Sequence, residues 1–274
     1  MSQLSDYKAA PINLFGQGTD QSTGTGTVDP SITSSIGAKF NLADGRQVAL
    51  VSVGTVALAS GKLVQSAAQT TAFSSTGLAI TVPTTYPATA GTFQILATNS
   101  TTVLNINQYA GGYLVVSSGT GIGQTLQINS HQPAASSATF VINLVDPIQV
   151  TLDATSTVTL LNNPYQNVII APATETGVPV GATFYPLAAS VANTYNGTSG
   201  ALTVQGTQQF GFIVTKGTIG ILVDNTVTNV GYSVGRSAAT AGAVGVETLT
   251  TAGFVGTAMQ TLTSAQTGLI FLDL

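Results

Sequence analysis

Short apolar runs separated by turn-forming residues make up most of the chain from Ala38 onward. Val, Ile, Thr, Phe and Tyr are dense within the runs, and Gly, Asn, Pro and Ser interrupt them at short intervals. Lys39–Leu42 and Gln47–Val51 flank Asp44-Gly45, a dipeptide typical of a tight hairpin turn. The pattern therefore predicts β-strands joined by short loops.

Further short strands are predicted at residues 92–96, 103–106, 113–116, 125–128, 140–144, 158–161, 210–214 and 220–223. The connections between them contain turn-forming residues. We expect a turn at Asn99–Thr101, a hairpin loop over Ser117–Gly123 and a turn at Lys216-Gly217.

Helix signals are weak. The longest Ala- and Leu-containing stretch, Val53–Ala72, is interrupted by Gly54 and Gly61 and sustains no apolar stripe of helical period. Many short strands with a turn about every eight to twelve residues favour barrels or sandwiches. The predicted fold class is all-β, with antiparallel β-barrel or β-sandwich modules built from many short strands and an extended N-terminal arm.

The first 40 residues differ in composition from the rest. Gly16–Thr27 has almost nothing to bury, so we expect residues 1–40 to form an extended arm and residues 41–274 an all-β body. Ala171–Pro179 has linker composition, which suggests a subdivision of the body near residues 171–180. The candidate partner-binding residues of the arm are its apolar side chains, Leu4, Tyr7, Ile12, Leu14 and Phe15.

Charged residues make up only 6% of the chain, against about 25% in an average soluble domain. A surface of neutral hydroxyls and amides has little charge to keep copies apart, which suits a subunit that packs against neighbours. The net charge is -4 and the few cations are scattered singly, so we expect no nucleic-acid partner. No apolar run of about 18 residues and no classical signal peptide is present, so no membrane association is expected.

Candidate chemistry is sparse. The chain has no Cys, and its one histidine, His131, lies in a turn-like stretch without a second histidine to share a metal. Asp146 and Asp153 are the only acids close in sequence, and a turn-forming role is expected for most carboxylates. Gly119–Gly123 is interpreted as a hairpin loop because it lacks the Lys-Ser/Thr of a phosphate-binding loop. We therefore expect no catalytic residue, no metal, no cofactor and no enzymatic activity.

The aromatic residues could instead form a carbohydrate platform or fill the core. Five phenylalanines fall in apolar runs, which predicts core packing for Phe40, Phe93, Phe140, Phe212 and Phe271.

Several glycine-rich and strand-like segments carry a resemblance to a known family. They are Asp44–Arg46, Val48–Val51, Ala57–Gln65, Tyr109–Val116, Gly121–Asn129, Leu144–Ile148 and Leu160–Tyr165. Over about residues 44 to 235 this pattern resembles capsid decoration or cement proteins of tailed bacteriophages. It is a pattern of glycines, turns and strands, and contains no catalytic signature.

The resemblance implies a virion structural protein that binds the outer capsid surface and bridges neighbouring capsid subunits. Its partners would be the major capsid protein and itself, as a homotrimer, and it would be made in the host cytoplasm. The alternative is a tail-fibre or surface adhesin that binds a receptor or glycan through exposed aromatic residues. A polysaccharide-cleaving enzyme is a third hypothesis, which requires two acids within about 5–9.5 Å of each other in a cleft.

Overall fold

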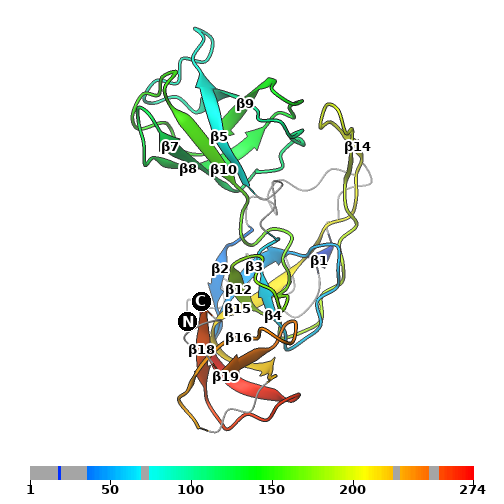
Figure 1. Ribbon diagram of the computed structural model, residues 1–274. Helices are drawn as coiled ribbons and strands as arrows, with labels where there is room; N and C mark the ends of the chain where they lie inside the picture. The colour runs from blue at the N-terminus through cyan, green and yellow to red at the C-terminus, as the bar shows by residue number, and fades with distance from the viewer. Residues whose placement is uncertain (1–17, 20–35, 69–73, 225–228, 247–252) are drawn as a thin grey trace. The chain divides into compact units, whose positions relative to one another are not determined.

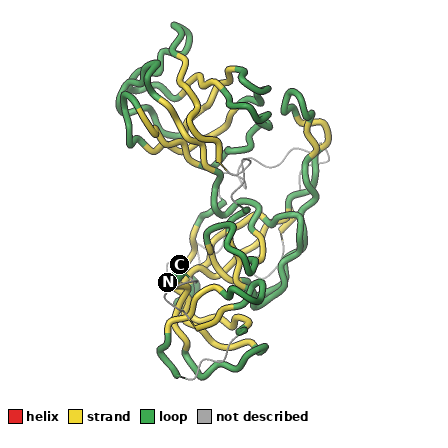
Figure 2. The backbone as a smooth tube through the Cα atoms, viewed as in Figure 1, coloured by secondary structure: helices red, strands yellow, loops and turns green. Residues whose placement is uncertain are grey.

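The computed structural model describes residues 18–19, 36–68, 74–224, 229–246 and 253–274 (Figures 1 and 2). The regular structure of these residues consists of β-strands and no helix, which confirms the all-β prediction. They form two compact units. The sheet unit contains residues up to Ala67, Pro164–Ala192 and Thr207–Leu274, and the barrel unit contains Ala68–Asn163 and Asn193–Gly206. The chain passes between the two units four times, so the barrel unit is made of two insertions.

The barrel unit is a closed antiparallel barrel of six strands in the order β10-β5-β6-β9-β8-β7. Its strands are β5 (Ser74–Thr81), β6 (Gln94–Thr98), β7 (Tyr113–Ser118), β8 (Thr125–His131), β9 (Thr139–Leu144) and β10 (Thr157–Leu161). Side chains alternate between the interior and the surface, as Leu126 and Ile128 of β8 show by pointing into the core. A separate pair, β13 (Thr194–Tyr195) and β14 (Leu202–Val204), completes the unit.

The sheet unit is built on one eleven-stranded, curled sheet. Its main order is β11-β4-β12-β15-β19-β18-β16-β17, and β3 and β1 also pair with β15, while β2 pairs with β3. The strands are β1 (Gly18–Thr19), β2 (Lys39–Asn41), β3 (Gln47–Ser52), β4 (Leu63–Gln65), β11 (Ile169–Ile170), β12 (Pro179–Ala182), β15 (Gln209–Leu222), β16 (Ser233–Arg236), β17 (Val244–Val246), β18 (Phe254–Ala258) and β19 (Thr267–Asp273).

The predicted hairpins at 39–51 and 113–128 are confirmed. Asn41 pairs with Gln47 across the first, and Tyr113 pairs with Gln127 across the second. The predicted strand at 103–106 is wrong: Leu104 forms only an isolated bridge with Ala134. A strand requires several consecutive residues paired with a neighbouring strand, and in this segment only one residue is paired.

The predicted turn at Lys216-Gly217 is also wrong, because β15 runs through it without a break. A bulge at Thr215 shifts the register, so that Val214 faces Val48 while Lys216 faces Gln47 of β3. Gly217 has a φ of 106° and lies against Arg46, where an added Cβ would come within 3.0 Å of the Arg46 side chain. The sequence pattern marked the irregularity correctly but not its form, since bulges and turns use the same residues.

The linker-like segment 171–179 lies within the sheet unit. The guanidinium of Arg236, only 5% exposed, donates hydrogen bonds to the carbonyl oxygens of Pro172 at 2.5 Å and Ala173 at 3.0 Å. The side-chain amide of Gln65 donates to the hydroxyl of Thr176 at 2.8 Å. These contacts with the buried side chains of Arg236 and Gln65 hold a segment whose composition alone resembles a flexible connection.

Candidate interaction site

The outward face of β19 carries apolar side chains where a one-sided sheet normally carries polar ones. Along the strand, Gly268, Ile270 and Leu272 are buried, and the residues between them point outward. Two of these outward residues are Leu269, 45% exposed, and Phe271, 41% exposed. The alternation is regular, so their exposure follows from the strand's geometry and not from a local irregularity.

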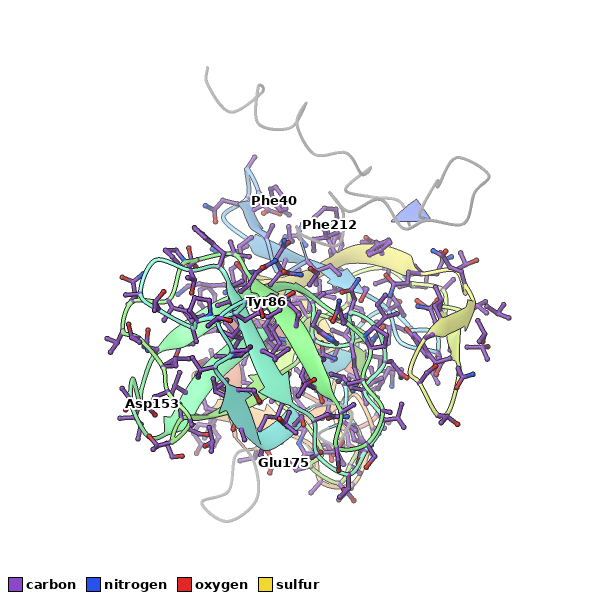
Figure 3. The ribbon with its side chains drawn as sticks, turned by 90° about the horizontal axis from the view of Figure 1, so that it is seen from above. Phe40, Tyr86, Asp153, Glu175 and Phe212 are labelled. Carbon is purple, nitrogen blue, oxygen red and sulfur yellow. The ribbon has the colours of Figure 1, made fainter. Side chains whose placement is uncertain are left out.

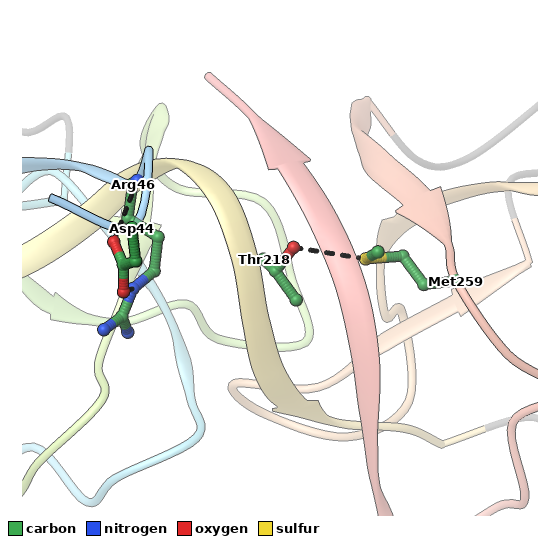
Figure 4. Close-up of polar contacts among 4 residues, drawn as sticks. All are labelled: Asp44, Arg46, Thr218 and Met259. Atoms are coloured by element: carbon green, nitrogen blue, oxygen red, sulfur yellow. Dashed lines mark hydrogen bonds and ion pairs between the residues drawn. The ribbon is translucent and has the colours of Figure 1, made fainter. Parts of the chain in front are cut away.

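The neighbouring strand extends this apolar surface. Met259 follows β18, and its backbone N–H donates to the carbonyl oxygen of Leu269 at 3.1 Å. The hydroxyl of Thr218 on β15 donates to the Met259 sulfur at 3.4 Å, so the Met259 side chain reaches across β19 (Figure 4). Phe254, 46% exposed, begins β18 and pairs with Gly235 of β16.

We call Phe254, Met259, Leu269 and Phe271 the apolar face, since these four side chains are each 41–46% exposed on β18, directly after β18 and on β19. Its polar border includes Thr218, which pairs with Phe271, and an ion pair between Lys216 and Asp273 at 2.8 Å. Both charged side chains are about half exposed and lie beside the face. Leu269 and Phe271 are neighbours on the outward side of β19, and Met259 is hydrogen-bonded to Leu269. Grouped exposed apolar residues with a polar rim mark interaction surfaces in soluble proteins.

The predicted arm residues Leu4, Tyr7, Ile12, Leu14 and Phe15 lie outside the described residues, so their role stays a prediction. The chain that follows them is described at Gly18–Thr19. There, β1 pairs with Gln209 and Phe210 of β15 in the sheet unit.

Core packing was predicted for five phenylalanines and holds for three of them. Phe140 and Phe212 are buried, and Phe40 packs edge-on against Phe212 with ring centroids 5.7 Å apart (Figure 3). For Phe93 and Phe271 the prediction is wrong, because these side chains are 50% and 41% exposed. Phe93 precedes β6, and Phe271 takes the outward position of an apolar run, so neither side chain is directed inward by strand alternation.

His131 is a buried core residue at the end of β8, not part of a turn, and is 2% exposed. Its Nε2 accepts a hydrogen bond from the backbone N–H of Tyr109 at 2.9 Å, and its Nδ1 lies 2.9 Å from the carbonyl oxygen of Gln132. This arrangement requires the neutral tautomer with the proton on Nδ1. Burial lowers the pKa of His131 to about 4, and the hydrogen bond to Gln132 partly opposes this change.

The carboxylates of Asp44 and Asp153 stabilise turns. The pKa of Asp153 is lowered by hydrogen bonds from the hydroxyls of Thr120 and Thr155, and the pKa of Asp44 by the backbone N–H of Arg46. Among the described residues, no three His, Asp or Glu side chains gather as metal ligands would. The described residues also contain no helix that is long and apolar enough to cross a membrane.

Comparison of this chain with protein-family models, with curated proteins and with solved structures finds no match.

Proposed function

We propose that this chain is a virion structural protein that binds the outer surface of a tailed-bacteriophage capsid and stabilises it by bridging neighbouring capsid subunits. Its partners are the major capsid protein and two further copies of itself. The observation that carries the proposal is the apolar face on β19 and on and directly after β18, where four large apolar side chains remain 41–46% exposed. The resemblance to decoration proteins supplies the identity of the partner.

The energetics of the apolar face suit a repeated, reversible contact. Full burial of a large apolar side chain contributes about 1.5–3 kcal/mol, and these side chains are already more than half buried, so the four together contribute ~2–5 kcal/mol. One such contact is weak, but a trimer multiplies it through linked binding events. Contacts that form only in the assembled shell add their free energy to the assembled state.

The scarcity of charge supports the same conclusion. With 6% charged residues, the surface can be covered by a partner with little desolvation of ions. The Lys216–Asp273 pair at the border is about half exposed.

A direct test is co-sedimentation of the purified chain with expanded, protein-depleted capsids of its phage. We expect saturable binding in a fixed ratio to the capsid protein. The double variant Leu269→Ser/Phe271→Ser should weaken binding by at least about tenfold, since it removes half of the apolar face. The control is Phe93→Ser, an exposed phenylalanine of the barrel unit, which should bind like the unchanged chain.

Absence of saturable binding by the folded, unchanged chain would contradict the proposal. Equal weakening by Phe93→Ser and by the double variant would show that the apolar face is not the contact. The tail-fibre or adhesin alternative would then take its place, and one feature of the barrel unit favours a glycan-binding role in its own right.

A further inference from the structure

A groove of about 510 Å³ opens on the outer surface of the barrel unit. Its volume lies within the range of roughly 300–1,000 Å³ found for small-molecule sites. The residues that matter most to its chemistry are Tyr86, Phe93, Gln94, Asn129, Ser130 and Asn143. None of the residues that line it is charged.

Two residues of the groove lining are aromatic, Tyr86 and Phe93. Phe93 is 50% exposed, and its backbone carbonyl oxygen is fixed by a hydrogen bond from the N–H of Leu144 at 2.8 Å. Tyr86 lies in the loop between β5 and β6, where its N–H donates to the carbonyl oxygen of Pro83 at 3.0 Å. Two rings on fixed backbone segments offer apolar faces to a ligand without a large loss of conformational entropy.

The lining also contains three neutral polar side chains that are hydrogen-bonded to one another across three strands, which we call the amide row: Gln94, Asn143 and Ser130. Gln94 of β6 pairs with Asn143 of β9, and the Gln94 amide donates to the Asn143 amide oxygen at 2.8 Å. Asn143 in turn donates to the hydroxyl of Ser130 on β8 at 2.8 Å. These bonds orient the amides and hold the row rigid.

A bulge in β8 adds a further polar group. The register shifts between Ile128 and Ser130, so that Asn129 and Ser130 both avoid the core while Ile128 and His131 remain buried. Bulges often re-aim a side chain beside a functional site. Here the bulge brings an exposed amide to the groove.

We infer that this groove binds a neutral saccharide, with the apolar face of one sugar ring on Phe93 and its hydroxyls on the amide row. A pyranose has an apolar C–H face and a rim of hydroxyls that both donate and accept hydrogen bonds. An aromatic ring can stack on the C–H face of the sugar. Side-chain amides both donate and accept hydrogen bonds, so they can pair with its hydroxyls. A lining without cations offers nothing to pair with a phosphate or an acidic sugar.

Saccharide binding would be separate from capsid binding, because the groove belongs to the barrel unit and the apolar face to the sheet unit. A decoration protein with such a groove would also attach the particle to polysaccharide at a cell surface. Each function therefore has its own residues and can be lost separately.

The test is binding of the full chain to an array of neutral and acidic oligosaccharides built from glucose, galactose, mannose and N-acetylhexosamines. Affinities of the neutral oligosaccharides that bind are then measured by titration. We expect saturable binding to at least one of them. Phe93→Ala should weaken it about tenfold, and Asn143→Ala by a similar factor.

The matched control is Phe254→Ala, which removes a phenylalanine of similar exposure, 46% against 50%, from the sheet unit. It should leave saccharide affinity unchanged. Thermal unfolding of each variant verifies that the fold is retained, and the conservative Phe93→Tyr variant should keep the affinity if Phe93→Ala unfolds the barrel.

Binding of acidic sugars only, binding of no oligosaccharide, or equal loss of affinity in Phe254→Ala would overturn the inference. Capsid binding in the same preparations separates this outcome from failure of the proposed function.

Discussion

At the scale of the residue, His131 shows how a titratable side chain becomes part of a core. Its ring packs against those of Tyr109 and Phe140, with centroid distances of 5.8 Å and 6.0 Å. Both ring nitrogens lie within hydrogen-bonding distance of backbone groups. Protonation would remove the acceptor that Tyr109 needs and place a charge away from water, which is why the neutral form is favoured.

This arrangement predicts acid destabilisation. The pKa of His131 is about 4 in the folded chain and 6.5 in the unfolded chain, so the unfolded state binds more protons between these values. The free energy of unfolding should be highest above pH 6.5 and fall by up to about 3 kcal/mol as the pH drops to 4. Urea unfolding of the chain across this range measures the slope.

The matched variant is His131→Gln, whose side-chain oxygen can still accept from the Tyr109 N–H but does not titrate. The slope between pH 6.5 and 4 should shrink in this variant. Asp44 and Asp153, whose pKa values are lowered from 3.8, change charge below this window in both proteins. An identical slope in the two proteins would show that His131 is not the group responsible.

The exposed phenylalanines show that the burial of a single side chain cannot be predicted from the apolar run that contains it. Phe140 and Phe271 both lie in apolar runs, yet one is 1% exposed and the other 41%. A continuous run such as 269–272 does not reveal whether one or both of its faces are covered. Knowledge of the neighbouring layer is needed, and only the fold provides it.

At the scale of the element, β15 joins two environments in one strand. From Phe210 to Val214 every side chain is buried, because apolar clusters lie on both faces of the sheet. After Lys216 only alternate residues are fully buried. The bulge at Thr215 and the positive φ of Gly217 lie where the strand changes from burial on both faces to burial on one face.

Gly217→Ala should therefore be costly. The substitution strains a φ of 106° and brings a Cβ within about 3.0 Å of Arg46. We expect a loss of ~2–3 kcal/mol in the free energy of unfolding. The control is Gly45→Ala, where φ is 84° but no atom lies within 4 Å, and the expected loss is about 1 kcal/mol. Urea denaturation compares the two, and equal losses would refute a steric role for Arg46.

The strands themselves were largely predictable from sequence, because short β-rich runs bounded by Gly, Asn and Asp carry the signal locally. The Asp44-Gly45 hairpin is an example, since the turn lies where its residues predict it and Asn41 pairs with Gln47 across it. The strand pairing that closes the barrel could not be predicted from local sequence, since β10 pairs with both β5 and β7, whose residues are far from it in sequence. The groove was missed for the same reason: its amide row comes from three strands.

At the scale of the whole molecule, the division into two units separates two sets of exposed aromatic residues. Phe93 belongs to the barrel unit, and Phe254 and Phe271 belong to the sheet unit. Each unit has its own buried core, so substitutions on one surface leave the packing of the other unit intact.

The N-terminal residues give a prediction at this scale. Deleting residues 1–17 removes Leu4, Tyr7, Ile12, Leu14 and Phe15 but keeps β1, and deleting residues 1–35 removes β1 as well. If the arm straps onto a neighbouring subunit, both deletions should weaken capsid attachment by at least about tenfold through lost avidity. Circular dichroism should show that the β-body remains folded. Unfolding of the body, or unchanged capsid attachment of both deletion variants, would contradict the hypothesis that the arm binds a neighbouring subunit.

The most direct measurement of the central claim is cryo-electron microscopy of expanded, protein-depleted capsids saturated with the full chain. We predict density at symmetric positions on the outer surface, with three copies at each site and with β18 and β19 of the sheet unit against the capsid protein. Bare capsids at saturating concentrations, or bound copies whose apolar face points into solvent, would contradict the account.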